Sequence, residues 1–272
     1  MVDLVVTGAG GRIARFLRLA WAEAAPADLR PIWVGRGDGY DLSWDIGAGT
    51  VPVWPRGAVV LHLAGVVRGT EADLARNAAL IPPLLAACAQ NGAAALLFAS
   101  TAAVYRPSAV PAGEDTPPDP QNPYGRAKLA AEHLVAAATL PVTRLRIGNV
   151  AGADALLGRN DGIVRLDPVP GRDSGPVRSW IGPKTLAVVL AHLAALAPQR
   201  HLPAVLNVAS DPPLPMEALL EAAGRAWHWG PPNPAVVPDA VMAVDRLAAL
   251  CPLPQADAAG LIAEIRSLGV RA

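Results

Sequence analysis

The sequence is poor in cysteine and carries no net charge. Its 272 residues include 2 cysteines, and 23 Lys plus Arg balance 23 Asp plus Glu. Cys88 and Cys251 lie far apart without metal-ligand spacing, which favours two buried thiols in a reducing compartment over a disulfide framework. The balanced charge argues against nucleic acid or an anionic membrane surface as a partner. We therefore expect a small-molecule substrate.

A long uninterrupted apolar run is also missing, despite a hydrophobic content of 52%. The most apolar windows, residues 78–98 and 186–197, contain proline and polar residues or are too short to span a bilayer. The first residues run directly into a strand pattern without the segments of a secretory signal. These features predict a soluble, cytoplasmic protein that has no membrane partner.

Short aliphatic runs alternate with Ala- and Leu-rich helical stretches through residues 1–150, the pattern of βαβ units. This predicts an α/β fold: a Rossmann-like doubly wound parallel sheet with a small C-terminal substrate-binding portion. The dinucleotide-binding domain comprises residues 1–150, rejoined by a helix near 185–197 and a strand near 205–208. Residues 151–181 and 209–272 form the smaller portion. The expected strands of the first part are residues 4–6, 31–34, 59–63, 96–99 and 142–147.

The segment TGAGGRIA places Gly8, Gly11 and Ala14 at G-x-x-G-x-x-A spacing between the first strand and its helix. Small residues allow a tight turn and a close approach of the backbone to a pyrophosphate, whose charge is stabilised at the helix N-terminus. A simple strand-to-helix turn is the alternative. The position at the start of a βα unit favours a cofactor loop.

The acid that usually follows the second strand is absent, because Gly35, Arg36 and Gly37 follow Val34. Arg36 could pair with a 2′-phosphate, which favours NADP over NAD as the cofactor. Alternatively, Arg36 is a solvated loop charge, and Asp38 or Asp41 reaches the adenosine.

The chain contains only two lysines, and one of them, Lys128, follows Tyr124 by four residues in the segment PYGRAK. With three tyrosines in the chain, the chance count of this spacing is roughly 0.02. Residues four apart share a helix face. A tyrosine holds its proton to about pH 10, and a nearby cation lowers that pKa. The pair therefore indicates a proton-transfer site, with a surface helix pair as the alternative.

Together these segments resemble the extended short-chain dehydrogenase/reductases, also labelled NAD-dependent epimerase/dehydratases, over about the first two-thirds of the chain. The resemblance implies a hydride-transferring enzyme with NAD(P) as cofactor. TGAGGRIA, the Asp-Leu pair at 41–42, LHLAG at 61–65 and the Asn of NAALIPP all match its cofactor-contacting segments. The cofactor residues so implied, together with Arg36, Tyr124 and Lys128, are Gly8, Gly10, Gly11, Arg12, Ile13, Asp41, Leu42, Leu63, Ala64, Gly65 and Asn77.

The segment ASTAAVY resembles the one that carries the family's catalytic Ser or Thr, which makes Thr101 the third catalytic residue beside Tyr124 and Lys128. Thr101, Asn149 and Arg178 match positions that contact substrate. Pro82 and Pro83 depart from a continuous helix of the family and should delay or kink it. A homodimer through residues 83–91 and 124–138 is also implied by the resemblance.

Ala102 and Ala103 occupy the positions where 4,6-dehydratases of the family carry an Asp-Glu pair, which argues against that activity. The leading interpretation is a dehydrogenase or reductase for a sugar, sugar acid or related hydroxy or keto compound. A nucleotide-sugar 4-epimerase with tightly held NAD stays open, as does a non-catalytic NAD(P)-binding regulatory protein. The histidines lack ligand spacing, so no metal is expected, and the segment GPK at 182–184 replaces an acid usual in the family.

Overall fold

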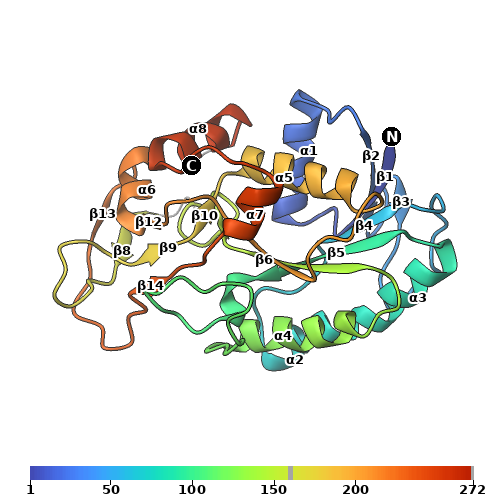
Figure 1. Ribbon diagram of the computed structural model, residues 1–272. Helices are drawn as coiled ribbons and strands as arrows, with labels where there is room; N and C mark the ends of the chain where they lie inside the picture. The colour runs from blue at the N-terminus through green and yellow to red at the C-terminus, as the bar shows by residue number, and fades with distance from the viewer. Residues whose placement is uncertain (159–161, 271–272) are drawn as a thin grey trace.

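The computed structural model describes residues 1–158 and 162–270. A seven-stranded parallel sheet runs through the molecule in the order β11-β6-β5-β4-β1-β2-β3 (Figure 1). This doubly wound arrangement confirms the predicted Rossmann-like α/β class. Its strands are β1 (Val2–Thr7), β2 (Leu29–Gly35), β3 (Leu42–Ser43), β4 (Val59–His62), β5 (Ala95–Thr101), β6 (Val142–Ile147) and β11 (Val205–Val208).

Helices cover both faces of the sheet. Helices α1 (Arg12–Glu23) and α5 (Pro183–Leu196) lie on one face, and α2 (Glu71–Ala79), α3 (Ile81–Asn91) and α4 (Pro123–Ala136) lie on the other (Figure 1). Successive residues of β4 alternate between the two cores, because Leu61 packs with α1 and α5 whereas Val60 packs with α3 and α4. This double burial explains why the strands read as continuous apolar runs.

The helix that follows β4 is interrupted, as the two prolines predict. Helix α2 ends at Ala79, and α3 begins at Ile81 with proline in its first turn. Proline is tolerated there because the first-turn N–H groups have no partner within the helix. The prolines therefore mark a helix start rather than a kink.

The C-terminal part carries short strands and helices around a separate core that contains Leu157, Trp180, Leu219 and Ile262. The tail also returns to the main sheet, because α7 (Asp245–Leu250) contacts β11. The domain boundaries stay a prediction. The other elements of this part are β7 (Asn149–Val150), β8 (Val164–Leu166), β9 (Val177–Arg178), β10 (Trp180–Ile181), β12 (Leu214–Pro215), α6 (Met216–Ala223), β13 (Trp227–Trp229), β14 (Asp239–Ala240) and α8 (Ala258–Ser267).

Both cysteines are buried free thiols, as their spacing predicts. Burial raises the pKa of Cys88 to about 12, so this thiol is unreactive at neutral pH. Across residues 1–158 and 162–270, no helix combines the length and apolar character needed to cross a membrane.

Candidate cofactor and catalytic site

The glycine loop after β1 lies against the segment after β4. Gly8 has a φ of 77°, and a Cβ placed on it would lie 2.5 Å from the backbone nitrogen of Ala64. Only glycine allows these two loops to approach so closely. The loops lie at the carboxyl edge of the sheet, where the chain order reverses between β1 and its neighbours β2 and β4. Ligands of open α/β sheets bind at such a switch point.

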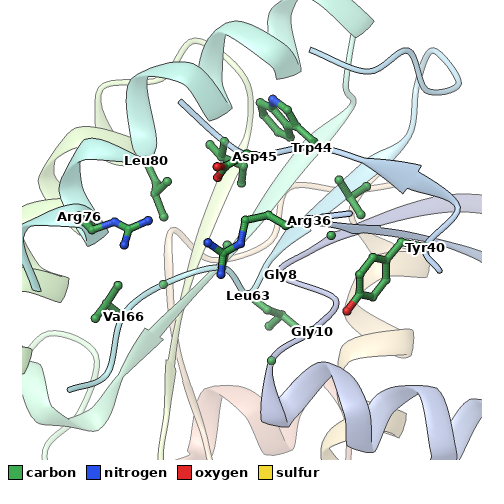
Figure 2. A pocket seen from close by; sticks show the side chains of 16 residues that line it. Gly8, Gly10, Arg36, Tyr40, Trp44, Asp45, Leu63, Val66, Arg76 and Leu80 are labelled. Atoms are coloured by element: carbon green, nitrogen blue, oxygen red, sulfur yellow. The ribbon is translucent and has the colours of Figure 1, made fainter. Parts of the chain in front are cut away.

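A cavity of about 400 Å³ opens at this edge (Figure 2). It is lined by the loops that follow β1, β2, β3 and β4, and by α2. Arg36, after β2, and Arg76, on α2, supply positive charge to the lining (Figure 2). The residues predicted to contact the cofactor that line it are Gly8, Gly10, Gly11, Arg36, Leu63, Ala64 and Gly65.

The Asp-apolar pair that lines the cavity differs from the pair expected from the sequence. The Asp41 carboxylate accepts a hydrogen bond of 2.7 Å from the backbone N–H of Trp33, and Leu42 packs against the core under α3 and α4. Asp45 and Ile46, just beyond β3, line the cavity instead. An Asp-apolar dipeptide occurs twice in YDLSWDI, so the sequence signal was present but was assigned to the earlier copy.

Asn77 and Ile13, which are also expected to contact the cofactor, make contacts within the protein near the cavity. Asn77 is 3% exposed. Its amide accepts from Val66 N–H at 3.1 Å and donates to the Val66 carbonyl at 2.8 Å, which fixes the loop after β4. Ile13 packs against the core between the sheet and α1. Direct cofactor contact by these residues stays a prediction.

Thr101 and Tyr124 are brought together by a close approach of α4 to the end of β5. The Asn122 side chain caps α4 by accepting from Gly125 N–H at 2.8 Å. A Cβ on Gly125 would lie 2.1 Å from the carbonyl oxygen of Ala103, in the 3₁₀ turn η1 (Ala102–Val104). This contact places Tyr124, in the first turn of α4, near Thr101, whose side chain lowers the pKa of the phenol.

Tyr124 is partly buried, and burial raises the pKa of its phenol above the ordinary value. The Thr101 side chain and the Arg12 charge oppose that shift. Arg12, expected only as a cofactor contact, is therefore also a cation that favours the Tyr124 phenolate. Arg12 extends from the first turn of α1 and donates to the Asp154 carbonyl at 3.3 Å.

Lys128 lies one turn further along α4 and is 4% exposed. Its Nζ is 4.3 Å from the centroid of the Phe98 ring, at the β4–β5 border of the sheet. Burial lowers its pKa to about 8, and the Glu132 carboxylate opposes this effect. The neighbouring His62 is held neutral, because burial and then the Lys128 charge lower its pKa to about 3.

The two residues predicted to contact substrate lie in different settings. Asn149 begins β7, directly after the end of β6, and is partly buried. Arg178 donates from Nη1 to the carbonyls of Val177 and Pro238, and from Nη2 to that of Val237. Its guanidinium thus holds the 237–238 loop, and a role in substrate binding stays a prediction.

The fold is Rossmann-like, with partly buried Tyr124 and buried Lys128 at the sheet edge that bears the cavity. The close contact at Gly8 forms a cradle that a side chain would fill, and the arginines suit a phosphate-bearing ligand, so the residues fit a dinucleotide. The model of the NAD dependent epimerase/dehydratase family matches residues 56–165. This match covers 110 of the 272 residues, so the likeness to the family is established for that part of the chain.

Curated relatives match part of the chain. A UDP-glucose 4-epimerase of Azospirillum brasilense is 43% identical over 106 residues, which cover 35% of this chain and 30% of that protein. A UDP-glucose 4-epimerase of Corynebacterium glutamicum is 44% identical over 82 residues, covering 28% of this chain and 25% of that protein. The matched stretches therefore span less than a third of these relatives.

Solved structures match the chain nearly end to end at low identity. The Bacillus cereus UDP-glucuronic acid 4-epimerase in complex with UDP-glucuronic acid and NAD has a TM-score of 0.75 and 19% identity, covering 98% of this chain and 99% of that one. A dTDP-glucose 4,6-dehydratase from Streptomyces venezuelae, with NAD bound, also has a TM-score of 0.75 and 19% identity, covering 98% and 97%. These likenesses establish the fold, which epimerases and dehydratases share.

Proposed function

We propose that the chain is an NAD(P)-dependent oxidoreductase. It interconverts a secondary alcohol and a ketone in a sugar, sugar acid or related small metabolite, with Tyr124 as acid and base. The observation that carries this proposal is the placement of partly buried Thr101 and Tyr124 with buried Lys128 at the edge of the sheet that also bears the glycine-loop cavity. The match of residues 56–165 to the epimerase/dehydratase family model supports it.

The reaction divides between cofactor and chain. A bound nicotinamide cofactor supplies the hydride acceptor or donor. During alcohol oxidation, the Tyr124 oxygen takes the hydroxyl proton as the carbon loses hydride; during ketone reduction, the phenol returns a proton to the carbonyl oxygen. The Thr101 hydroxyl holds the reacting oxygen close to Tyr124. Lys128, whose pKa is about 8, stays largely protonated at pH 7 and favours the phenolate electrostatically.

The raised pKa of Tyr124 gives the two directions different starting points. At neutral pH the phenol keeps its proton, so it is ready to act as the donor in ketone reduction. Oxidation requires the phenolate, which the positive charges of Arg12, Lys128 and an oxidised nicotinamide favour. We therefore expect the oxidative rate to rise more steeply with pH than the reductive rate.

Absorbance at 340 nm with free sugars, sugar acids and nucleotide sugars tests the activity. Tyr124→Phe should abolish turnover and leave cofactor binding nearly intact, because only the proton-carrying oxygen is lost. Tyr105→Phe is the matched control: its buried hydroxyl donates to Asn207 Oδ1 at 2.8 Å, away from the proton transfer. Wild-type activity in Tyr124→Phe would remove this residue from the mechanism.

A 4-epimerase of nucleotide sugars is the second candidate, favoured by the UDP-glucose 4-epimerases among the relatives. Such an enzyme oxidises and re-reduces the same carbon, so it needs no added cofactor when NAD is tightly held. Product isomerised without a net change at 340 nm would establish this activity. Net cofactor turnover would establish the dehydrogenase.

NADP as the preferred cofactor belongs to the same proposal and is supported by Arg36 in the cavity lining. A charge-assisted contact to a 2′-phosphate is worth about 1.5–3 kcal/mol, or at least about tenfold in affinity. Arg36→Ala should therefore raise Kd for NADP about tenfold and change Kd for NAD little. Arg200→Ala, an exposed change beyond the end of α5, is the control. Equal effects on both cofactors would defeat the preference.

We also propose a cytoplasmic homodimer with residues 83–91 and 124–138 at its interface. The contact between α3 and α4 within the chain supports it, since one continuous surface can carry both helices. Analytical ultracentrifugation measures the mass in solution, and a monomer across the micromolar range would reject this assembly.

A further inference from the structure

A carboxylate with no access to solvent lies behind the Tyr-Lys pair. Glu132, on α4, is 0% exposed. Its Oε1 accepts from the Ser100 hydroxyl at 2.5 Å and from Arg146 Nε at 3.1 Å, and its Oε2 accepts from Arg146 Nη2 at 2.7 Å. Burying an ion pair costs several kcal/mol per ion in desolvation, which good geometry only partly offsets. An apolar pair would fill this space at lower cost, so stability alone does not explain these residues.

The partners of Glu132 lie next to the residues assigned to the reaction. Ser100 precedes Thr101 at the end of β5, and Arg146 lies on β6, which leads into Asn149. Lys128 lies one helical turn before Glu132, where residues four apart share a face. One carboxylate thus connects α4 to the ends of the two neighbouring strands that carry the other site residues.

The charges around Lys128 come from few groups. Glu132, from the same helix, favours the ammonium form, and burial opposes it. His62, from β4, faces Lys128 as a neutral ring, and Phe98, from β5, presents its ring face. Among the described residues, Glu132 is therefore the acid that keeps Lys128 protonated.

We propose that Glu132 is a positioning residue for the proton transfer: its carboxylate keeps Lys128 as an ammonium and holds the ends of β5 and β6 against α4. This inference rests on the proposed function for its role in turnover. Its electrostatic part concerns Lys128 alone and is testable without a substrate.

The scarcity of lysine makes that test direct. Lysine labelled with ¹³C at Cε gives signals from Lys128 and Lys184 only. Lys184 lies at an exposed pair with Glu23, so Lys184→Arg removes its signal without touching the site. In this background, Glu132→Gln should lower the titration midpoint of Lys128 by about one pH unit or more. Glu264→Gln, a glutamate change on α8, should leave the midpoint unchanged.

Turnover gives the second measurement. A fall of the Lys128 midpoint from about 8 to about 7 reduces the ammonium fraction about eightfold at pH 8.5 and hardly at pH 6. Glu132→Gln should show the same pattern in kcat. A purely structural role would lower activity by a similar factor at all pH values.

Glu132→Gln leaves Arg146 as an unpaired buried cation and could unfold the chain. The double variant Glu132→Met with Arg146→Met replaces the pair by apolar residues, and its Lys128 midpoint should also fall. An unchanged midpoint in a folded variant overturns the inference. If the Lys128 midpoint falls in the Glu132 variants but the wild type shows no turnover with any substrate, the electrostatic role is supported and the proposed function is rejected.

Discussion

Replacing Glu264 by alanine should destabilise the fold, because Glu264 lies on α8 and caps the N-terminus of another helix, α5. The residue before α5 is Gly182, which has no capping side chain. Glu264 of α8 accepts from Lys184 N–H at 2.8 Å, Thr185 N–H at 2.9 Å and the Thr185 hydroxyl at 2.6 Å. A Cβ on Gly182 would lie 2.1 Å from the same carboxylate. The carboxylate thus occupies the space of a capping side chain. It also holds the segment GPK at 182–184, which lacks the acid usual in the family.

The expected loss is about 2–3 kcal/mol. Loss of a helix cap costs about 1 kcal/mol, loss of a negative charge at the helix N-terminus about 0.3–1 kcal/mol, and a poorly solvated N–H about 1 kcal/mol more. For a chain of this size, each kcal/mol lowers Tm by about 2–4 °C. Glu264→Ala should therefore melt about 4–12 °C below wild type, and Glu264→Gln, which keeps one acceptor oxygen, should melt between the two.

Urea unfolding followed by tryptophan fluorescence measures this loss. Glu23→Ala is the matched control, because Glu23 contacts the same lysine through an exposed pair of 2.8 Å between Oε1 and Nζ of Lys184. Exposed pairs contribute about 0–1 kcal/mol. Equal losses in Glu264→Ala and Glu23→Ala would refute the capping argument.

Two further predictions follow from the buried titratable groups. Lys128→Met should stabilise the protein at pH 7 by about 3 kcal/mol while abolishing turnover, because the folded state then no longer desolvates an ammonium whose pKa has fallen from 10.5 to about 8. The gain, read by urea unfolding, should shrink between pH 8 and 10.5, where Lys128 of the folded wild type is already neutral. The free energy of unfolding of the wild type should fall by about 1.4 kcal/mol per pH unit between pH 6.5 and 3, because His62 is protonated below 6.5 in the unfolded chain and only near pH 3 in the folded chain. His62→Gln should remove this pH dependence. An unchanged pH dependence in the variant would assign the acid sensitivity to other groups.

Local patterns in the sequence predicted much of this structure. Continuous apolar runs predicted the strands because both faces of the sheet are buried. The glycine spacing predicted the loop after β1, where Gly8 meets Ala64. Proline pairs predicted the boundary between α2 and α3. Each of these patterns depends on residues close together in the sequence, so the structure that it predicts can be recognised without knowledge of the tertiary contacts.

Other features depend on contacts between distant segments. Glu264 caps a helix about 80 residues earlier, and no local rule pairs these positions. The sequence analysis assigned the Asp-apolar pair to Asp41 and Leu42, whereas the structure places Asp45, just after the two-residue strand β3, at the cavity. The sequence analysis expected a nearby cation to lower the Tyr124 pKa, but burial is the larger effect here and raises it. Helical spacing predicts which residues are close together and does not predict how deeply they are buried.

The groups that oppose folding and the groups that support it lie in different parts of the molecule. His62 and Lys128 each have a pKa shifted against their charged form, and both lie near the carboxyl edge of the sheet. The Glu264 cap lies between α5 and α8, on the opposite face from α4. Lys128→Met should therefore give a more stable, inactive protein, and Glu264→Ala a less stable protein that keeps its activity while folded. Measured together, these opposite signs separate residues retained for chemistry from residues retained for the scaffold.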